Sequence, residues 1–115
     1  MEMKEEKKGE VLVLILEGEL MGGEGSQAVQ DRIYKAIEEG EIFVVLDMGG
    51  IKWMNSAGLG IIMASITTLR GSGGDLKLAN VNERVLRPIE ITKLDRVIEM
   101  FETMEKAVDS YASGG

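Results

Sequence analysis

The chain has 115 residues, of which 44% are hydrophobic and 29% are charged, and its formal net charge is −7. This length corresponds to one domain with a core large enough to fold without disulfides or metals. The acidic balance argues against nucleic acid as a partner, because phosphates would be repelled. The chain contains no Cys and no His, which excludes thiol chemistry and tetrahedral zinc sites.

The hydrophobic runs are short. The longest uninterrupted apolar run covers residues 11–16, far below the ~20 residues of a membrane span. Residues 1–8 are charged and lack the apolar segment of a signal peptide. The sequence therefore predicts a cytoplasmic protein without membrane insertion.

The first half of the chain predicts two strands and a helix. Residues 1–8 are suited to a charged edge strand, and residues 11–16 to an interior strand with both faces covered. Ser26 is the expected N-cap of a helix that ends at Gly40. The expected buried stripe of this helix consists of Val29, Ile33, Ala36 and Ile37.

A glycine-rich segment lies between the second strand and this helix. Four glycines fall within residues 18–26, a composition that can form a phosphate-binding loop. However, the Lys-Ser or Lys-Thr pair of such a loop is missing, and the carboxylate of Glu24 would repel phosphate. We therefore expect a flexible loop and no bound cofactor.

The centre of the chain predicts a strand, a turn and a helix. Residues 42–46 are apolar at every position and indicate a second interior strand. Gly49, Gly50 and Gly58 are expected to give the backbone the freedom to turn. A helix over residues 57–70 follows, because apolar side chains recur there at helical spacing.

Two polar residues stand at the start of this helix. The hydroxyl of Ser56 can accept from the free amides of the first turn, so Ser56 is a candidate N-cap. The short amide of Asn55 is expected to cap or brace the turn, and not to bind metal. The helix itself has no acid or lysine before Arg70. A helix with so few charges is either buried in the protein or forms a surface that binds a partner. Trp53 and Met54, which are expected to be exposed just before the helix, favour the partner-binding surface.

The last third predicts a short strand over residues 76–79 and then a third helix capped by Asn80 or Asn82. Pro88 should keep that helix short, because it lacks an amide hydrogen. If the turn after it needs a positive φ, Lys93 occupies a strained position. A last strand over residues 97–101, a closing helix over residues 103–111 and a disordered tail over residues 113–115 complete the chain.

Strands and helices thus alternate along most of the chain. This order predicts an α/β domain with a largely parallel sheet and right-handed crossovers. No linker or internal repeat divides the chain.

Several segments, in their order and spacing, resemble the signature of STAS domains, and more narrowly that of bacterial anti-sigma factor antagonists. They are residues 16–20 (LEGEL), residues 55–60 (NSAGLG) after the acidic strand end at Asp47, residues 74–78 (GDLKL) and residues 92–95 (TKLD). The resemblance implies a single α/β domain over residues 1–112, with a mixed, largely parallel sheet of about five strands and about four helices.

The resemblance also implies a function. In the family, the serine at the position of Ser56 is phosphorylated by an anti-sigma factor serine kinase of the histidine-kinase-like ATPase fold. The unmodified protein captures this kinase and frees a sigma factor; a cognate phosphatase is a possible further partner. The expected partner-binding residues are Met21, Gly22, Trp53, Met54, Asn55, Ser56, Ala57, Gly58, Gly60, Ile61 and Ala64.

Two departures from the family pattern leave an alternative open. Met21 and Asn55 stand where the family commonly has acids. The alternative is a STAS adaptor in a lipid-transport or signalling complex, in which Ser56 serves structure or is never phosphorylated.

Catalysis is the least favoured interpretation. A serine nucleophile needs a base, usually His, and the chain has none. The Gly-x-Ser-x-Gly pattern also fails, because Met54 stands at its first position. The amine of Lys52 would need a strongly lowered pKa to serve as the base.

Overall fold

The computed structural model describes residues 1–112, and the predicted tail over residues 113–115 lies outside them. These residues form one α/β domain with a five-stranded mixed sheet, as predicted. The elements are β1 (Glu2–Lys8), β2 (Val11–Leu20), α1 (Gly23–Glu38), β3 (Phe43–Met54), α2 (Ser56–Gly71), β4 (Asp75–Ala79), α3 (Glu83–Ile91), the 3₁₀ helix η1 (Leu94–Arg96), β5 (Met100–Phe101) and α4 (Met104–Ala112).

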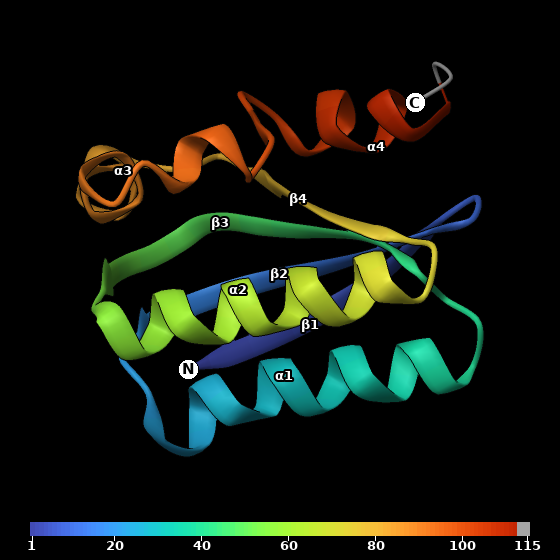
Figure 1. The fold of residues 1–115 in the computed structure, drawn as a ribbon, viewed down its shortest axis with the longest axis horizontal. Coiled ribbons are helices and arrows are strands. Elements are labelled where there is room, and N and C mark those ends of the chain that lie inside the picture. The colour runs from blue at the N-terminus through green and yellow to red at the C-terminus, as the bar shows by residue number, and fades with distance from the viewer. Residues whose placement is uncertain (113–115) are drawn as a thin grey trace.

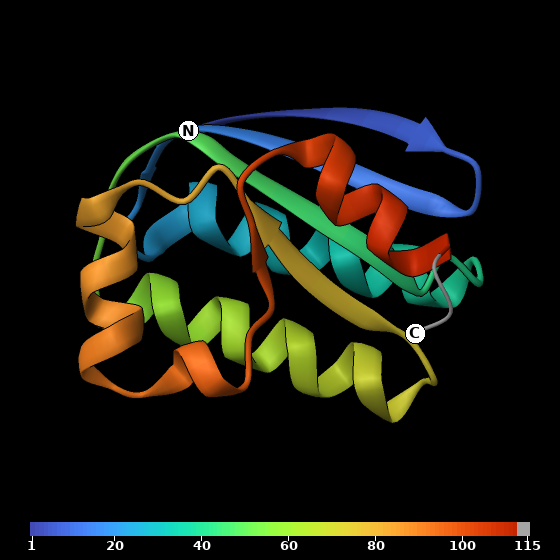
Figure 2. The ribbon, with the colours of Figure 1, turned by 90° about the horizontal axis from the view of Figure 1, so that it is seen from above.

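The sheet follows the chain order β1-β2-β3-β4-β5. β1 pairs antiparallel with β2, and the other neighbouring strands are parallel. Helices α1 and α2 cover one face, α4 covers part of the other, and α3 lies at the carboxyl end of β3 (Figures 1 and 2). Aliphatic side chains of the interior strands fill both layers, because each of these strands is apolar on both faces.

The two glycines of β3 do not make a turn, contrary to the prediction. β3 continues beyond residue 46 to Met54, where it pairs with Leu20 of β2. Gly50 is required for space instead, because a Cβ atom there would lie 2.7 Å from the carbonyl oxygen of Leu16. β3 thus extends beyond its last pair with β4, which is Asp47 with Ala79, and leads directly to the start of α2.

The helix ends also depart from the prediction in places. α1 begins at Gly23, so Ser26 is not its N-cap. Ser26 is buried inside the first turns, and its hydroxyl accepts a hydrogen bond of 3.0 Å from the amide of Gly22. The third helix is capped by Asn82, one of the two predicted caps, whose side chain accepts a hydrogen bond from the amide of Val85. The helix continues through Pro88 to Ile91, so the proline does not end it as expected.

The turn after α3 explains why the last strand is short. Lys93 has a φ of 61°, in the left-handed region, so the condition under which the sequence placed strain at this residue is met. The chain then forms η1, and Val97 is exposed in the turn after it. Consequently only Met100–Phe101 remains as a strand, where residues 97–101 had been expected.

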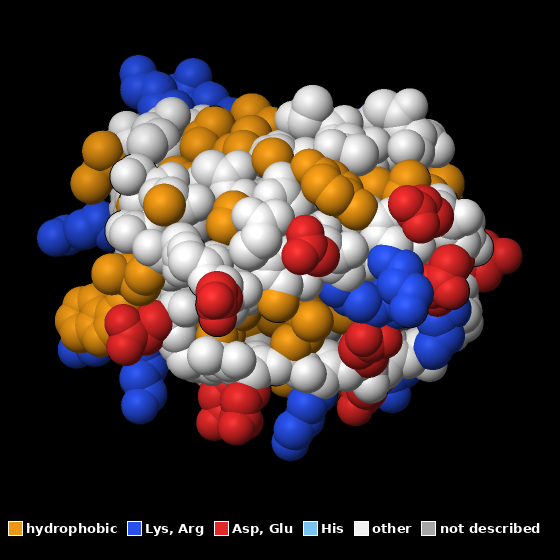
Figure 3. All heavy atoms as spheres, turned by 90° about the horizontal axis from the view of Figure 1, so that it is seen from below, with side chains coloured by type: hydrophobic (Ala, Val, Ile, Leu, Met, Phe, Trp, Pro, Cys, Tyr) orange, Lys and Arg blue, Asp and Glu red, His pale blue; other side chains and the backbone are white. Residues whose placement is uncertain are grey.

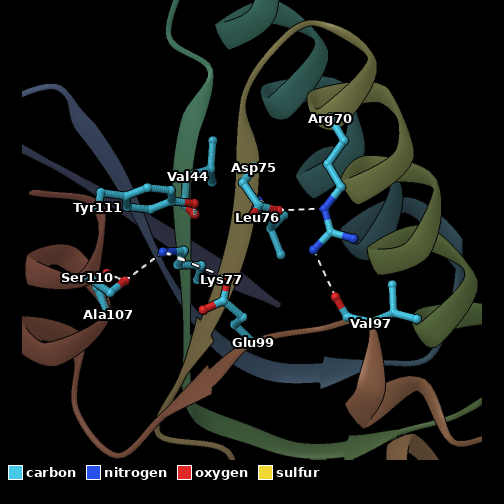
Figure 4. A network of polar contacts seen from close by, with 10 residues as sticks. All are labelled: Val44, Arg70, Asp75, Leu76, Lys77, Val97, Glu99, Ala107, Ser110 and Tyr111. Carbon is cyan, nitrogen blue, oxygen red and sulfur yellow. Dashed lines mark hydrogen bonds and ion pairs between the residues drawn. The ribbon is translucent and has the colours of Figure 1, made fainter. Parts of the chain in front are cut away.

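Helix α4 packs on the sheet through hydrogen bonds as well as through apolar contacts (Figure 4). The hydroxyl of Tyr111 donates to the carbonyl of Val44 at 2.8 Å, and burial raises the pKa of Tyr111 above its usual range. Lys77 of β4 is buried, with its Nζ 2.8 Å from the Ser110 hydroxyl and 4.1 Å from the centre of the Tyr111 ring. The ammonium therefore has both a hydrogen-bond partner and a cation–π contact.

Replacing Tyr111 with Phe should cost about 1 kcal/mol of unfolding free energy, because the Val44 carbonyl loses its donor while the ring remains. For a chain of this size the melting temperature should fall by about 4 °C. The control is Tyr34→Phe on α1, whose hydroxyl accepts only a solvent-exposed hydrogen bond from Gln30; this change should alter stability by less than about 0.5 kcal/mol. Equal thermal melts for the two variants, followed by circular dichroism, would show that the bond to Val44 contributes nothing.

Candidate functional site

The start of α2 is held against the end of β2 by Asn55. The side chain of Asn55 accepts from the amide of Gly58 at 2.9 Å and donates to the carbonyl of Met21 at 3.0 Å. The Asn55 backbone amide is also bonded to the carbonyl of Leu20 at 3.4 Å. The predicted capping role of Asn55 is thus confirmed, and the side chain ties two loops together.

Ser56 is therefore not the N-cap, contrary to the first expectation. It is the first residue of α2, directly after the cap. Its side chain is exposed, and within residues 1–112 its hydroxyl makes no hydrogen bond. A free hydroxyl is thus presented to solvent at the positive end of a helix of 16 residues.

Gly58 permits the close approach of α2 to β2. A Cβ atom at this position would lie 1.9 Å from the carbonyl oxygen of Leu20. Such an overlap would push the helix away from the strand. Gly58 is buried for this reason, so it contributes to the site by packing and not by surface.

The predicted partner-binding residues fall into three groups. One of them, Met54, had been expected to be exposed beside Trp53. This expectation is wrong, because Met54 is only 8% exposed and belongs to the main core. It turns inward because it is the last residue of β3, paired with Leu20. The exposed members are Met21, Trp53, Ser56, Ala57 and Gly60; the half-buried ones are Gly22, Asn55, Ile61 and Ala64; the buried ones are Met54 and Gly58.

The exposed side of α2 is uncharged over most of its length. Figure 3 views the face that α1 and α2 form, and its upper part, over α2, carries almost no charged side chains. Charged side chains gather over α1 instead. Ile61, Ala64 and Thr68 are half-buried on α2, and Gly60 and Thr67 are exposed. This face is contiguous with Ser56 along the helix, so one element carries both features.

One functional candidate was missed in the sequence. The guanidinium of Arg84 on α3 lies 4.4 Å from the centre of the Trp53 ring, and Trp53 is 48% exposed. The contact is a cation–π interaction between residues 31 positions apart, and no local pattern signals it. A hollow of about 520 Å³ beside it is lined by Glu17, Gly49, Gly50, Ile51, Lys52, Asn82, Glu83 and Arg84.

The described residues offer no group of three or more acidic side chains that would hold a metal ion. None of the helices in residues 1–112 combines the length and the apolar character required to cross a bilayer.

Comparison with known proteins identifies the family. Residues 2–107 match the STAS domain family, and the chain belongs to it. An anti-sigma-B factor antagonist of Bacillus subtilis is 34% identical over 58 residues, which are 50% of this chain and 53% of the relative. An anti-sigma F factor antagonist of Paenibacillus polymyxa is 26% identical over 99 residues, 85% of this chain and 84% of that protein.

The chain covers between 53% and 59% of the length of the curated relatives that share 30% identity or more with it. The structure of the unphosphorylated anti-sigma factor antagonist SpoIIAA has the same fold, with a TM-score of 0.83 at 23% identity and 96% coverage of both chains. The phosphorylated form of the Bacillus cell fate determinant SpoIIAA matches with a TM-score of 0.77 at 22% identity, over 96% of this chain and 99% of that one.

The glycine positions allow a direct test of the junction. Gly58→Ala should lower the unfolding free energy by about 3 kcal/mol, because the new methyl overlaps the Leu20 carbonyl. Gly60→Ala, two residues on, meets nothing within 4 Å and should raise it by up to about 1 kcal/mol through helix propensity. Urea unfolding measures both. Equal stability of the two variants would contradict the close approach of α2 to β2.

Proposed function

We propose that this protein is an anti-sigma factor antagonist that binds an anti-sigma factor serine kinase and is switched off by phosphorylation of Ser56. The kinase would have the histidine-kinase-like ATPase fold, and a cognate phosphatase would restore the active form. The protein acts by binding in the cytoplasm, without catalysis, nucleic acid or membrane insertion. Family membership and the names of its relatives support this proposal.

The observation that carries the proposal is the placement of Ser56. Its hydroxyl is exposed at the first position of α2, with no competing hydrogen bond among the described residues. A kinase can therefore reach the oxygen without unfolding the site. Because Asn55 already caps the helix, the hydroxyl is not needed for stability and is available for modification.

Phosphorylation at this position should leave the fold intact. A phosphate adds roughly −1.5 to −2 charge at neutral pH. The amino end of α2 stabilises negative charge through its dipole and its free amides. The first turn of α2 contains no acid that would repel the phosphate.

Phosphorylation of Ser56 would therefore weaken binding through the contact with the partner, and not through the fold of this chain. The uncharged face of α2 next to Ser56 suits an apolar contact. A phosphate dianion at the rim of such a contact would have to be desolvated without a matching cation. A penalty of ~3–4 kcal/mol corresponds to a several-hundredfold loss of affinity, sufficient for release.

The first test uses two serines of the same helix region. The chain is incubated with a candidate anti-sigma kinase and ATP, the phosphate is located by mass spectrometry, and kinase affinity is measured by calorimetry. Ser56→Ala should bind the kinase and resist inactivation, whereas Ser56→Glu should fold and bind poorly. The control is Ser72→Ala, at the exposed carboxyl end of α2. This variant should bind the kinase, be phosphorylated at Ser56 and lose affinity, as the native sequence does. Full phosphorylation of Ser56 with unchanged affinity would overturn the proposed switch.

A second test addresses the face of α2. Gly60→Lys places a charge in the middle of the uncharged face at a position with open space. It should keep or raise the melting temperature and weaken kinase binding at least tenfold, because the ammonium would be pushed into an apolar contact. Gly71→Lys, also in open space at the far end of the same helix, is the control and should bind normally. Equal affinities would remove this face from the interface.

One observation favours the second candidate, a STAS adaptor whose Ser56 is not phosphorylated. Both polar atoms of the Asn55 side chain are engaged inside the chain, one of them as a donor to the Met21 carbonyl. An aspartate cannot donate in this way, so the amide at position 55 serves the structure of this junction. A chain that no anti-sigma kinase phosphorylates, but that copurifies with a transport complex, would support this candidate.

A further inference from the structure

β1 is an edge strand with an open backbone. It pairs with β2 over all seven of its residues without a register shift, and it is the first strand of the sheet. In Figure 2, β1 lies along the upper margin of the molecule with no element beyond it. Amides and carbonyls on its outer side therefore face solvent and can pair with another strand.

The charges of β1 differ from those of the rest of the molecule. Its three acids and three lysines cancel, whereas the whole chain carries −7. Met3 packs against the core on the α1 face, and Glu5 is bonded to Arg32 there at 2.8 Å. The opposite face carries alternating charges, namely Glu2, Lys4, Glu6 and Lys8.

This alternation is self-complementary in one antiparallel register. When two copies pair centred on Glu5, Glu2 lies opposite Lys8 of the second copy and Lys4 opposite its Glu6, each pair occurring twice. A register centred on Lys4 would place Glu2 opposite Glu6, and one centred on Glu6 would place Lys4 opposite Lys8. Both of these oppose like charges.

The centre of the favoured register brings the two copies of Glu5 together. Each is held by the Arg32 of its own chain through hydrogen bonds of 2.8 and 3.0 Å. The guanidinium lowers the pKa of Glu5 and offsets its charge, so the two carboxylates meet as parts of ion pairs. The remaining pair on this face joins Met3 to Lys7, without like charges.

We propose that β1 is a contact surface for a second copy of this chain, in an antiparallel pairing centred on Glu5 that joins two five-stranded sheets into one. An edge of seven residues buries less area than a stable interface of ~1,000 Å² requires, so the dimer is weak and reversible. β1 and α2 lie at opposite margins of the molecule in Figure 2, so pairing leaves Ser56 accessible.

Cysteine cross-linking tests the register, because the native chain contains no Cys. In Glu5→Cys the two thiols would face each other with Cα atoms about 4.5–5.5 Å apart, within disulfide range. In Glu6→Cys the two Cα atoms would be about 8 Å apart, beyond the ~7 Å limit for a disulfide. Mild oxidation should therefore give a covalent dimer of the first variant and little of the second. Equal cross-linking, or none, overturns the register.

Charge exchange tests the pairing without a covalent bond. Sedimentation equilibrium up to millimolar concentration should detect a dimer of the unmodified chain. Lys4→Glu opposes acids at two places and should weaken association at least tenfold. The double exchange Lys4→Glu with Glu6→Lys restores opposite charges and should restore association. A monomeric unmodified chain, or a double variant no better than the single one, overturns the proposal; thermal melts confirm that each variant is folded.

Discussion

The close approach of α2 to the end of β2 is the constraint on which the site depends. Gly58 lies directly against the Leu20 carbonyl, where no larger residue fits. Asn55 then connects the same two segments through its bonds to Gly58 and Met21. A steric requirement and a hydrogen-bonded clamp thus fix the same junction from two sides. The amino end of α2 is consequently set before any partner binds.

This constraint determines what the exposed residues can do. Because Asn55 caps α2, the hydroxyl of Ser56 is not needed to cap the helix and is exposed to solvent. Because β3 extends past β4 to Met54, the junction projects beyond the carboxyl end of the neighbouring strand. The helix that follows presents an uncharged face. In the proposed function, a phosphate on Ser56 would therefore change the charge of the surface that the partner meets and would leave the fold that presents it unchanged.

Local patterns in the sequence were sufficient for most of the architecture. Uniformly apolar strands, helical spacing and glycine breaks predicted the sheet and its helices. Features that depend on distant contacts were not predictable. Met54 is buried because it pairs with Leu20, and Gly50 is needed because Leu16 lies beside it. The stacking of Arg84 on Trp53 likewise joins two elements that no local signal connects.

In the proposed function, Ser56 is modified on a preformed helix end, so phosphorylation changes the charge of this end and not its structure. Hydrogen exchange of the α2 amides, compared between the unmodified and the fully phosphorylated chain, measures whether α2 stays folded. Exchange should be equal or slower throughout α2 after phosphorylation, because the phosphate accepts hydrogen bonds from the free amides of the first turn. Faster exchange along α2, reaching Leu59 and the turns beyond it, would show instead that phosphorylation acts by unfolding the helix.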